Sequence, residues 1–367
     1  PSMSLDDEVF DGDIAIIGIG CRLPGDCGSP AQFWDRLTDG FDAVTEMPDN
    51  RRELLAGRYG RDLVSQRPRG GYLDDIEKFD ADFFGIAPRE ARSIDPQHRL
   101  LLEIAYESLE DAGLLPDSLR GAPIGVFIGI FLDEYWDMQR YTGSDVTAHT
   151  NTGGTMSIAA NRISYTFDFR GPSMSIDTAC SSSLVAVHLA CQSIRSGEST
   201  MALAGGVNLL LSPQTTAGFQ QASMISEIGR CSPFDASADG YVRSDGAGIV
   251  VLKQLLAARA DKDPIYAVIK GSAVNQDGRT AGITVPSVQA QKKMLTDVYG
   301  QAGISTSSVR FVEAHGPGTP VGDPVEAQAL GEILGLGREP GAACLIGSVK
   351  SNIGHAEAAS GVAGLIK

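Results

Sequence analysis

The apolar positions change their period several times along the chain, which predicts an alternation of strands and helices. Apolar runs of strand length lie at residues 13–19, 125–131, 201–211 and 249–253. Helical spacing of apolar positions occurs at residues 30–40, 99–112 and 181–194. A second series starts at residue 265, with strands at 310–314 and 344–350 and helices at 287–300 and 324–336. We therefore predict an α/β protein built from two similar βα halves.

The stretch around Cys180 has the clearest chemical character. Residues 173–178 alternate polar and apolar side chains and predict a buried strand, and helical spacing begins at Ser181. Cys180 then lies at a sharp turn into a helix N-terminus. Because unpaired N–H groups and the helix dipole favour an anion there, we predict a lowered pKa for the Cys180 thiol and a nucleophilic role.

Most intracellular cysteines are small buried apolar residues, so Cys180 alone is weak evidence for catalysis. Two histidines in the second half strengthen it. His315 and His355 each follow a predicted strand at a turn that contains glycine, where a side chain can reach a pocket. An active site between the two halves is the hypothesis that unites the three residues.

The predicted boundaries follow the same pattern. Residues 1–12 are acidic and aperiodic, which is typical of a flexible lead-in. Residues 13–367 form one domain, with an N-terminal half at about 13–260 and a C-terminal half at about 265–367. The second half reaches the end of the sequence within a predicted helix, so we expect it to be truncated.

Composition excludes several classes of function. The 367 residues carry a formal net charge of −16, which argues against binding to nucleic acid or to anionic membranes. No stretch approaches the roughly 20 apolar residues of a membrane helix. The 6 cysteines lack the spacing of metal ligands, so we expect no metal, reduced thiols and a cytoplasmic location.

Two other features have ordinary explanations. A strand and a glycine turn at residues 13–20 resemble the start of a dinucleotide site, but Leu23 stands where the third glycine belongs and Pro24 interrupts the helix. We predict a structural role for His98 near a helix start.

Arginines are concentrated in a stretch, residues 42–72, that we predict to be irregular. The favoured interpretation is a solvated loop, and the alternative is a docking patch for an acidic partner. The arginines concerned are Arg51, Arg52, Arg58, Arg61, Arg67 and Arg69.

Three motifs in order carry a family resemblance. They are Asp-Thr-Ala-Cys-Ser-Ser-Ser at residues 177–183, Glu-Ala-His-Gly-Pro-Gly-Thr at 313–319 and Lys-Ser-Asn-Ile-Gly-His at 350–355. Together with Gly-Asp-Pro at 322–324, they resemble a β-ketoacyl synthase, and more narrowly the ketosynthase domain of a type I polyketide synthase, modular or iterative. The resemblance implies a thiolase-like fold in five layers, α-β-α-β-α, and a homodimer.

The resemblance also implies a reaction, the decarboxylative Claisen condensation of polyketide chain elongation. Cys180 would accept an acyl chain from the phosphopantetheine thioester of an acyl carrier protein. His315 and His355 would serve decarboxylation of a malonyl-type extender on a second carrier protein. The residue types suit this chemistry, because a thiolate exchanges thioesters and two imidazole donors stabilise an enolate oxygen.

Further roles come from the resemblance alone. It gives Lys350 an ordering role paired with Glu326, although a purely structural Lys350 is an equal interpretation. Thr319 is similar to a threonine that binds the pantetheine arm, and Asn352 is placed with it on the substrate side. The chain itself would bind no cofactor, because phosphopantetheine arrives on the carrier protein. An acyltransferase domain or protein would load the extender.

Two departures from the family pattern keep alternatives open. Pro317 replaces a threonine in the motif that contains His315, which removes a hydroxyl and a backbone donor beside the pantetheine channel. The family also continues beyond the position of Lys367 with strands and a glycine-rich segment. The first alternative is a ketosynthase that binds or transfers acyl chains without condensation. The second is a non-catalytic chain-length partner, which Cys180 disfavours.

Overall fold

A six-stranded mixed sheet dominates the N-terminal half of the computed structural model, which describes residues 12–60, 68–141, 146–339 and 341–367. The strand order is β5-β4-β6-β7-β1-β8. The expected lead-in lies outside the described residues, except for Gly12. The strands are β1 (Ile14–Arg22), β4 (Ile124–Gly129), β5 (Ser173–Ile176), β6 (Met201–Asn208), β7 (Gly246–Gln254) and β8 (Ala267–Ile269).

The central strands are buried on both faces, which explains their continuous apolar sequence. In β1, Ala15 and Ile17 face one hydrophobic cluster, whereas Ile14 and Ile16 face another on the opposite side. This alternation follows from the two-residue period of a strand. β4 pairs in parallel with β5 and β6, and β7 runs antiparallel to both β6 and β1.

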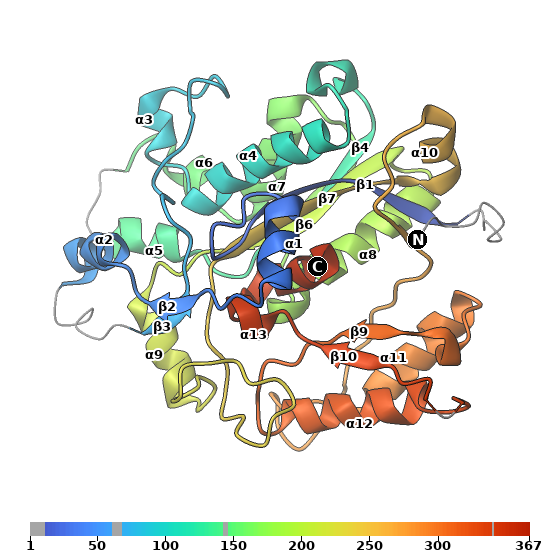
Figure 1. Cartoon of the computed structure of the whole chain (residues 1–367). Coiled ribbons are helices and arrows are strands. Elements are labelled where there is room, and N and C mark those ends of the chain that lie inside the picture. Colours follow the sequence, from blue (N-terminus) through green and yellow to red (C-terminus); the bar gives the residue numbers. More distant parts are fainter. Residues whose placement is uncertain (1–11, 61–67, 142–145, 340) are drawn as a thin grey trace.

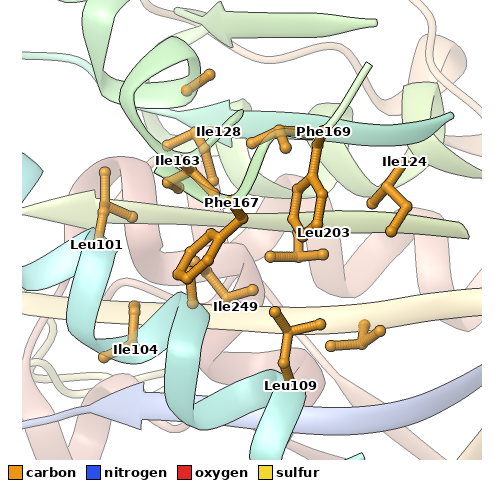
Figure 2. Close-up of a cluster of buried hydrophobic side chains, with 14 of the residues drawn as sticks. Leu101, Ile104, Leu109, Ile124, Ile128, Ile163, Phe167, Phe169, Leu203 and Ile249 are labelled. Carbon is orange, nitrogen blue, oxygen red and sulfur yellow. The ribbon is translucent and has the colours of Figure 1, made fainter. Parts of the chain in front are cut away.

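One face of the sheet is covered by α4 (Pro96–Asp111) and α7 (Ser157–Phe167). Figure 2 shows Leu101, Ile104 and Leu109 of α4 directed at the sheet. Gly18 and Gly20 lie inside β1, and a Cβ on either would come within 2.3 Å of a carbonyl oxygen of α4. These glycines therefore allow close packing of helix on strand, and the turn predicted at residues 18–20 is wrong.

The other face is covered by α8 (Ser182–Arg195) and α14 (Ser360–Ile366), which pack on each other. A two-stranded parallel sheet, β9 (Phe311–Glu313) and β10 (Leu345–Gly347), lies beyond them. α11 (Val288–Gln301) and α12 (Gly322–Leu334) form the outermost layer. Figure 1 thus shows the predicted order α-β-α-β-α, and the thiolase-like fold class is confirmed.

Two strands differ from their predicted places. The first strand of the second series, β8, joins the edge of the large sheet by pairing antiparallel with β1 instead of entering the second sheet. β5 is an edge strand, not a buried one, and its Met174 side chain is 41% exposed. Alternating polarity indicates a strand but does not say which strands flank it.

The stretch at residues 42–72 is more ordered than predicted. It contains β2 (Val44–Glu46), α2 (Asp49–Tyr59) and β3 (Arg69–Gly71). Arg51 of α2 is buried and pairs with Asp245 at 2.8 Å, so the prediction of a solvated loop is wrong at this residue. Arg69 donates to the Val44 carbonyl. Arg61 and Arg67 lie outside the described residues.

The remaining elements connect these layers. The helix predicted at residues 99–112 begins earlier, because Asp95 caps it by accepting the Gln97 N–H. His98 is buried at the start of this helix, in agreement with a structural role. The connecting helices are α1 (Pro30–Thr38), α3 (Pro88–Ala91), α5 (Glu134–Tyr141), α6 (Thr150–Gly154), α9 (Pro213–Gln221), α10 (Leu255–Asp261) and α13 (Lys350–Ile353). The 3-10 turns are η1 (Pro116–Leu119), η2 (Ala179–Ser181), η3 (Thr306–Ser308) and η4 (Glu357–Ala359).

Candidate active site

Cys180 lies in η2, the single turn between the edge strand β5 and α8. Ala179 has a φ of 54°, in the left-handed region that is strained for residues with a side chain. The turn is closed by Ser182, whose hydroxyl accepts the Thr178 N–H at 2.9 Å and donates to the Ala179 carbonyl at 2.7 Å. The predicted sharp elbow at Cys180 is therefore confirmed.

The predicted acidity of Cys180 is wrong. Burial raises the pKa of the thiol to about 11, and the Glu357 carboxylate acts in the same direction. The Lys350 ammonium lowers this pKa without outweighing burial. A helix N-terminus can be recognised in a sequence, whereas desolvation, which disfavours the thiolate, depends on the folded surroundings. The free enzyme therefore holds Cys180 as a neutral thiol near pH 7.

His315 follows β9 on a turn that is held by one carboxylate. Glu326 of α12 accepts the backbone N–H of His315 at 2.7 Å and that of Gly316 at 2.8 Å. Burial raises the pKa of Glu326, and these two bonds lower it. Glu326 thus acts on His315 through the backbone.

The rest of this turn is organised by Asp323. Its buried carboxylate accepts N–H groups from Gly318 and Thr319, and also from Phe234 in a loop of the first half. Pro317 is buried between two glycines whose φ values are 36° and 90°. Asp323, to which no role was assigned from the sequence, therefore ties the histidine turn to both halves.

His355 is buried and lies after α13, beyond Gly354. Its Nδ1 accepts the backbone N–H of Glu357 at 2.9 Å, and the Ser360 hydroxyl lies 2.7 Å from the same atom. Because a backbone N–H can only donate, Nδ1 is unprotonated and the neutral ring carries its proton on Nε2. His355 is therefore a hydrogen-bond donor at Nε2.

The two histidines meet, as the sequence predicted. Their ring centroids are 5.5 Å apart and the rings are nearly perpendicular, at 83°. The Tyr241 ring packs on His355 from the other side, with centroids 4.9 Å apart. η2, which carries Cys180, packs against η4 immediately after His355. The fold thus gathers Cys180 and both histidines where the halves meet.

Both rings are neutral at physiological pH. Burial lowers the pKa of His355 well below its ordinary value, and Lys350 and His315 add to the effect. Desolvation and then Lys350 lower the pKa of His315 as well, although this residue keeps some contact with solvent. A neutral imidazole donates from only one nitrogen, so its tautomer matters.

Lys350 is a buried cation at the centre of this site. Burial lowers its pKa, whereas Cys231, Glu313, Cys180 and Glu326 raise it. Within the described residues Lys350 forms no ion pair with Glu326, whose two oxygens bind the turn backbone. The predicted pairing is therefore wrong as a direct contact, and an electrostatic interaction replaces it.

The two predicted substrate contacts also serve the fold. The Thr319 hydroxyl accepts the Gly322 N–H at 3.2 Å and lies 3.4 Å from a carboxylate oxygen of Asp323. Asn352 donates from its side-chain amide to the Phe41 carbonyl at 2.8 Å. Thr319 adjoins the histidine turn, but this donor of Asn352 holds the N-terminal loop.

An ion pair that was left unassigned from the sequence supports the site. Arg243 and Glu357 form a buried, two-contact pair with distances of 2.6 and 3.0 Å. The two residues lie 114 positions apart, and no period or spacing connects positions at that separation. Their contact therefore had no local signal.

Metal and membrane sites were not expected from the sequence. Within the described ranges, no three His, Cys, Asp or Glu side chains are grouped as metal ligands. No helix in the same part of the chain combines the length and apolarity needed to cross a bilayer.

Comparisons with known proteins agree with this geometry. Residues 11–258 match the family model "Beta-ketoacyl synthase, N-terminal domain" and residues 266–367 match "Beta-ketoacyl synthase, C-terminal domain". The chain is 51% identical over 361 residues to one subunit of the phenolphthiocerol/phthiocerol polyketide synthase of Mycobacterium tuberculosis, which covers 98% of this chain and 19% of that relative. Another subunit of the same synthase is 49% identical, over 96% of this chain and 23% of its own length. The chain thus spans about a fifth of the curated relatives it matches.

Solved structures give the same result. The ketosynthase from module 6 of the bacillaene synthase of Bacillus subtilis is 42% identical, with a TM-score of 0.86 over 96% of this chain and 60% of that chain. The oxazolomycin ketosynthase domain OzmH KS7 of Streptomyces albus is 39% identical, with a TM-score of 0.87 over 96% of this chain and 61% of that one. This chain belongs to the β-ketoacyl synthase family, as a ketosynthase of the polyketide synthase type.

Proposed function

We propose that this chain catalyses the decarboxylative Claisen condensation of polyketide elongation. The observation that carries the proposal is the meeting of Cys180 with two neutral histidines, one of which is fixed as an Nε2 donor. A hydrolase would need only one such histidine as a base. Two imidazole donors suit a reaction that develops negative charge on a thioester oxygen.

The first half-reaction transfers an acyl group to Cys180. The sulfur attacks the thioester carbonyl of an acyl-carrier protein, the new C–S bond forms, and the pantetheine thiol leaves with the proton that Cys180 loses. Because the free thiol is neutral, deprotonation is part of this step and not a preceding equilibrium. The neutral rings of His315 and His355 are the adjacent groups able to pass that proton.

The second half-reaction forms the carbon–carbon bond. The malonyl-type extender loses carbon dioxide, and the electron pair of the broken bond moves into an enolate whose oxygen accepts from His355 and His315. The enolate carbon then attacks the Cys180 thioester, and the sulfur leaves as a thiolate that regains a proton. Lys350 supports this chemistry by stabilising negative charge in the recess and by keeping both histidines neutral.

The proposal includes the molecules that deliver the substrates. Phosphopantetheine arrives on acyl carrier proteins, Thr319 lies beside the histidine turn where the arm would pass, and an acyltransferase supplies the extender. Pro317 affects the shape of this passage and leaves the backbone anchors of His315 intact. The alternative of a ketosynthase without condensation is not favoured, because the Cys-His-His arrangement is complete.

A homodimer is part of the same proposal. β5, which leads to Cys180, pairs with β4 on one side only, so its other edge has backbone groups available for a second copy. Met174 of β5, Tyr165 of α7 and Leu184 of α8 are large apolar side chains that are 41%, 88% and 48% exposed. Sedimentation of the chain at micromolar concentration tests this assembly, and a monomer would contradict it.

Mass spectrometry and carbon dioxide release test the reaction. After incubation with a short acyl thioester, we expect an acyl adduct on the chain and none on Cys180→Ala. With a malonyl extender on a carrier protein, we expect carbon dioxide release that His355→Ala loses while keeping acylation. Acylation without any decarboxylation would support the non-condensing alternative, and normal decarboxylation by His355→Ala would refute the role of His355.

A further inference from the structure

The turn from His355 to Glu357 is held from both ends by one residue. The His355 N–H donates to the Val242 carbonyl at 2.7 Å, and the Ser244 N–H donates to the His355 carbonyl at 2.9 Å. Arg243 therefore runs alongside His355 as an isolated parallel bridge. Its side chain extends two residues further, to the carboxylate of Glu357.

The Arg243–Glu357 contact is strong and almost fully buried. Nε and Nη2 of Arg243 contact separate carboxylate oxygens at 2.6 and 3.0 Å, and each side chain is only 3% exposed. Arg243 also donates to the Thr216 hydroxyl at 2.8 Å, and its guanidinium lies 5.2 Å from the centre of the Phe219 ring. Such two-contact pairs fix both position and direction.

Glu357 needs this restraint because its backbone is strained. Its φ is 44°, in the left-handed region, and a non-glycine residue remains there only when its surroundings hold it. The N–H of this same residue donates to Nδ1 of His355. A change in the backbone at Glu357 would thus free Nδ1 and let the ring take its other tautomer.

We infer that Arg243 is a positioning residue for His355, because its ion pair with Glu357 holds the 355–357 turn and so keeps the imidazole proton on Nε2. The inference rests on the proposed function for its kinetic consequence. Arg243 touches no reacting atom and acts through Glu357. Loss of the pair leaves His355 in place but with a mixture of tautomers.

The main variant is Arg243→Lys, which keeps the charge and loses the two-contact geometry. The matched control is Arg51→Lys, because Arg51 is also 3% exposed and contacts both oxygens of a buried carboxylate, Asp245. Arg51 makes no contact with the 355–357 turn. We expect Arg243→Lys to lower kcat for carbon dioxide release by about tenfold or more, with KM and Cys180 acylation within about threefold. Arg51→Lys should change neither rate.

A spectroscopic measurement reads the tautomer without any turnover. In the full chain labelled with ¹⁵N-histidine, we expect one resonance pair of the neutral Nε2–H form that His355→Gln removes. Arg243→Lys should convert it to an averaged or mixed signal, and Arg51→Lys should not. An unchanged His355 signal, or parallel losses of acylation and decarboxylation, would overturn the inference. An inactive parent chain with the expected tautomer change would refute the proposed function alone.

A second variant keeps the test decisive if Arg243→Lys does not fold. Arg243→Gln combined with Glu357→Gln removes both members of the pair, so neither leaves the other as a lone buried charge. We expect this double variant to fold and to show the same tautomer mixing. Retention of the pure Nε2–H form there would show that the backbone bonds suffice and that Arg243 has no positioning role.

Discussion

Glu326 binds the two backbone N–H groups at His315 and Gly316, at 2.7 and 2.8 Å. One carboxylate on α12 thereby sets the direction in which the His315 side chain leaves its turn. Glu326→Leu would leave both donors without a partner in a partly buried place, so the turn should relax. We expect carbon dioxide release from a malonyl extender to fall by about tenfold or more, because one oxyanion donor is misplaced.

The control for this prediction lies on the same helix. Gln328 is exposed and contacts only Glu332 through its amide, so Gln328→Ala should keep the parent rate. Glu326→Gln retains one acceptor oxygen and should fall between the two. Parent-like decarboxylation by Glu326→Leu would show that Asp323 alone holds the turn.

The raised pKa of Cys180 predicts a pH dependence. Below a pKa of about 11 the thiolate fraction grows about tenfold for each pH unit, so alkylation by iodoacetamide should rise steadily from pH 7 to 9 without a plateau. Peptide mass spectrometry distinguishes Cys180 from the other cysteines. A plateau near pH 7 would instead indicate the low pKa expected from the helix N-terminus alone.

Charge variants test the cause of this shift. Glu357→Gln removes a negative charge that raises the pKa of Cys180, so alkylation at pH 8 should become faster by about threefold or more. Lys350→Met removes a positive charge that lowers it, so the reaction should slow by a similar factor. Changes in the same direction in both variants would mean that exposure, not charge, sets the rate.

Gly318 permits the turn that carries His315. Its φ is 90°, and a Cβ there would lie 2.7 Å from the Ser232 nitrogen and 3.2 Å from the Gly240 carbonyl oxygen. Gly318→Ala combines backbone strain with a clash against backbone atoms, so we expect a loss of about 2 kcal/mol or more in urea unfolding. Gly337 has a φ of 69° with no atom within 4 Å, and Gly337→Ala should cost only about 1 kcal/mol. Equal losses would place the whole effect in the backbone.

Arg51 and Asp245 join α2 to the strand β7 region across the molecule. Asp245 is fully buried and also accepts the N–H groups of Leu73 and Leu210. Arg51→Met would leave this carboxylate without its cation, so we expect a loss of about 3 to 5 kcal/mol in the free energy of unfolding. The exposed pair of Arg52 with Asp49 is the comparison, and Arg52→Met should cost less than about 1 kcal/mol. Similar losses in both variants would contradict a buried role for Arg51.

Local patterns in the sequence were sufficient for the fold class and for the three central residues. The order of strands and helices follows from apolar period, which each segment carries by itself. Cys180, His315 and His355 were identifiable because each lies in a short motif at a turn between a strand and a helix or loop. The family models and solved relatives agree with the ketosynthase class that these motifs indicated.

Only the tertiary structure decided the electrostatics and the supports of the site. The thiol pKa at Cys180 moves opposite to the sequence prediction, because desolvation sums over all surrounding atoms and not over one helix end. β5 is an edge strand because β4 occupies one side of it alone. The Arg243–Glu357 and Arg51–Asp245 pairs join positions 114 and 194 residues apart, and only the folded chain brings those charges into contact.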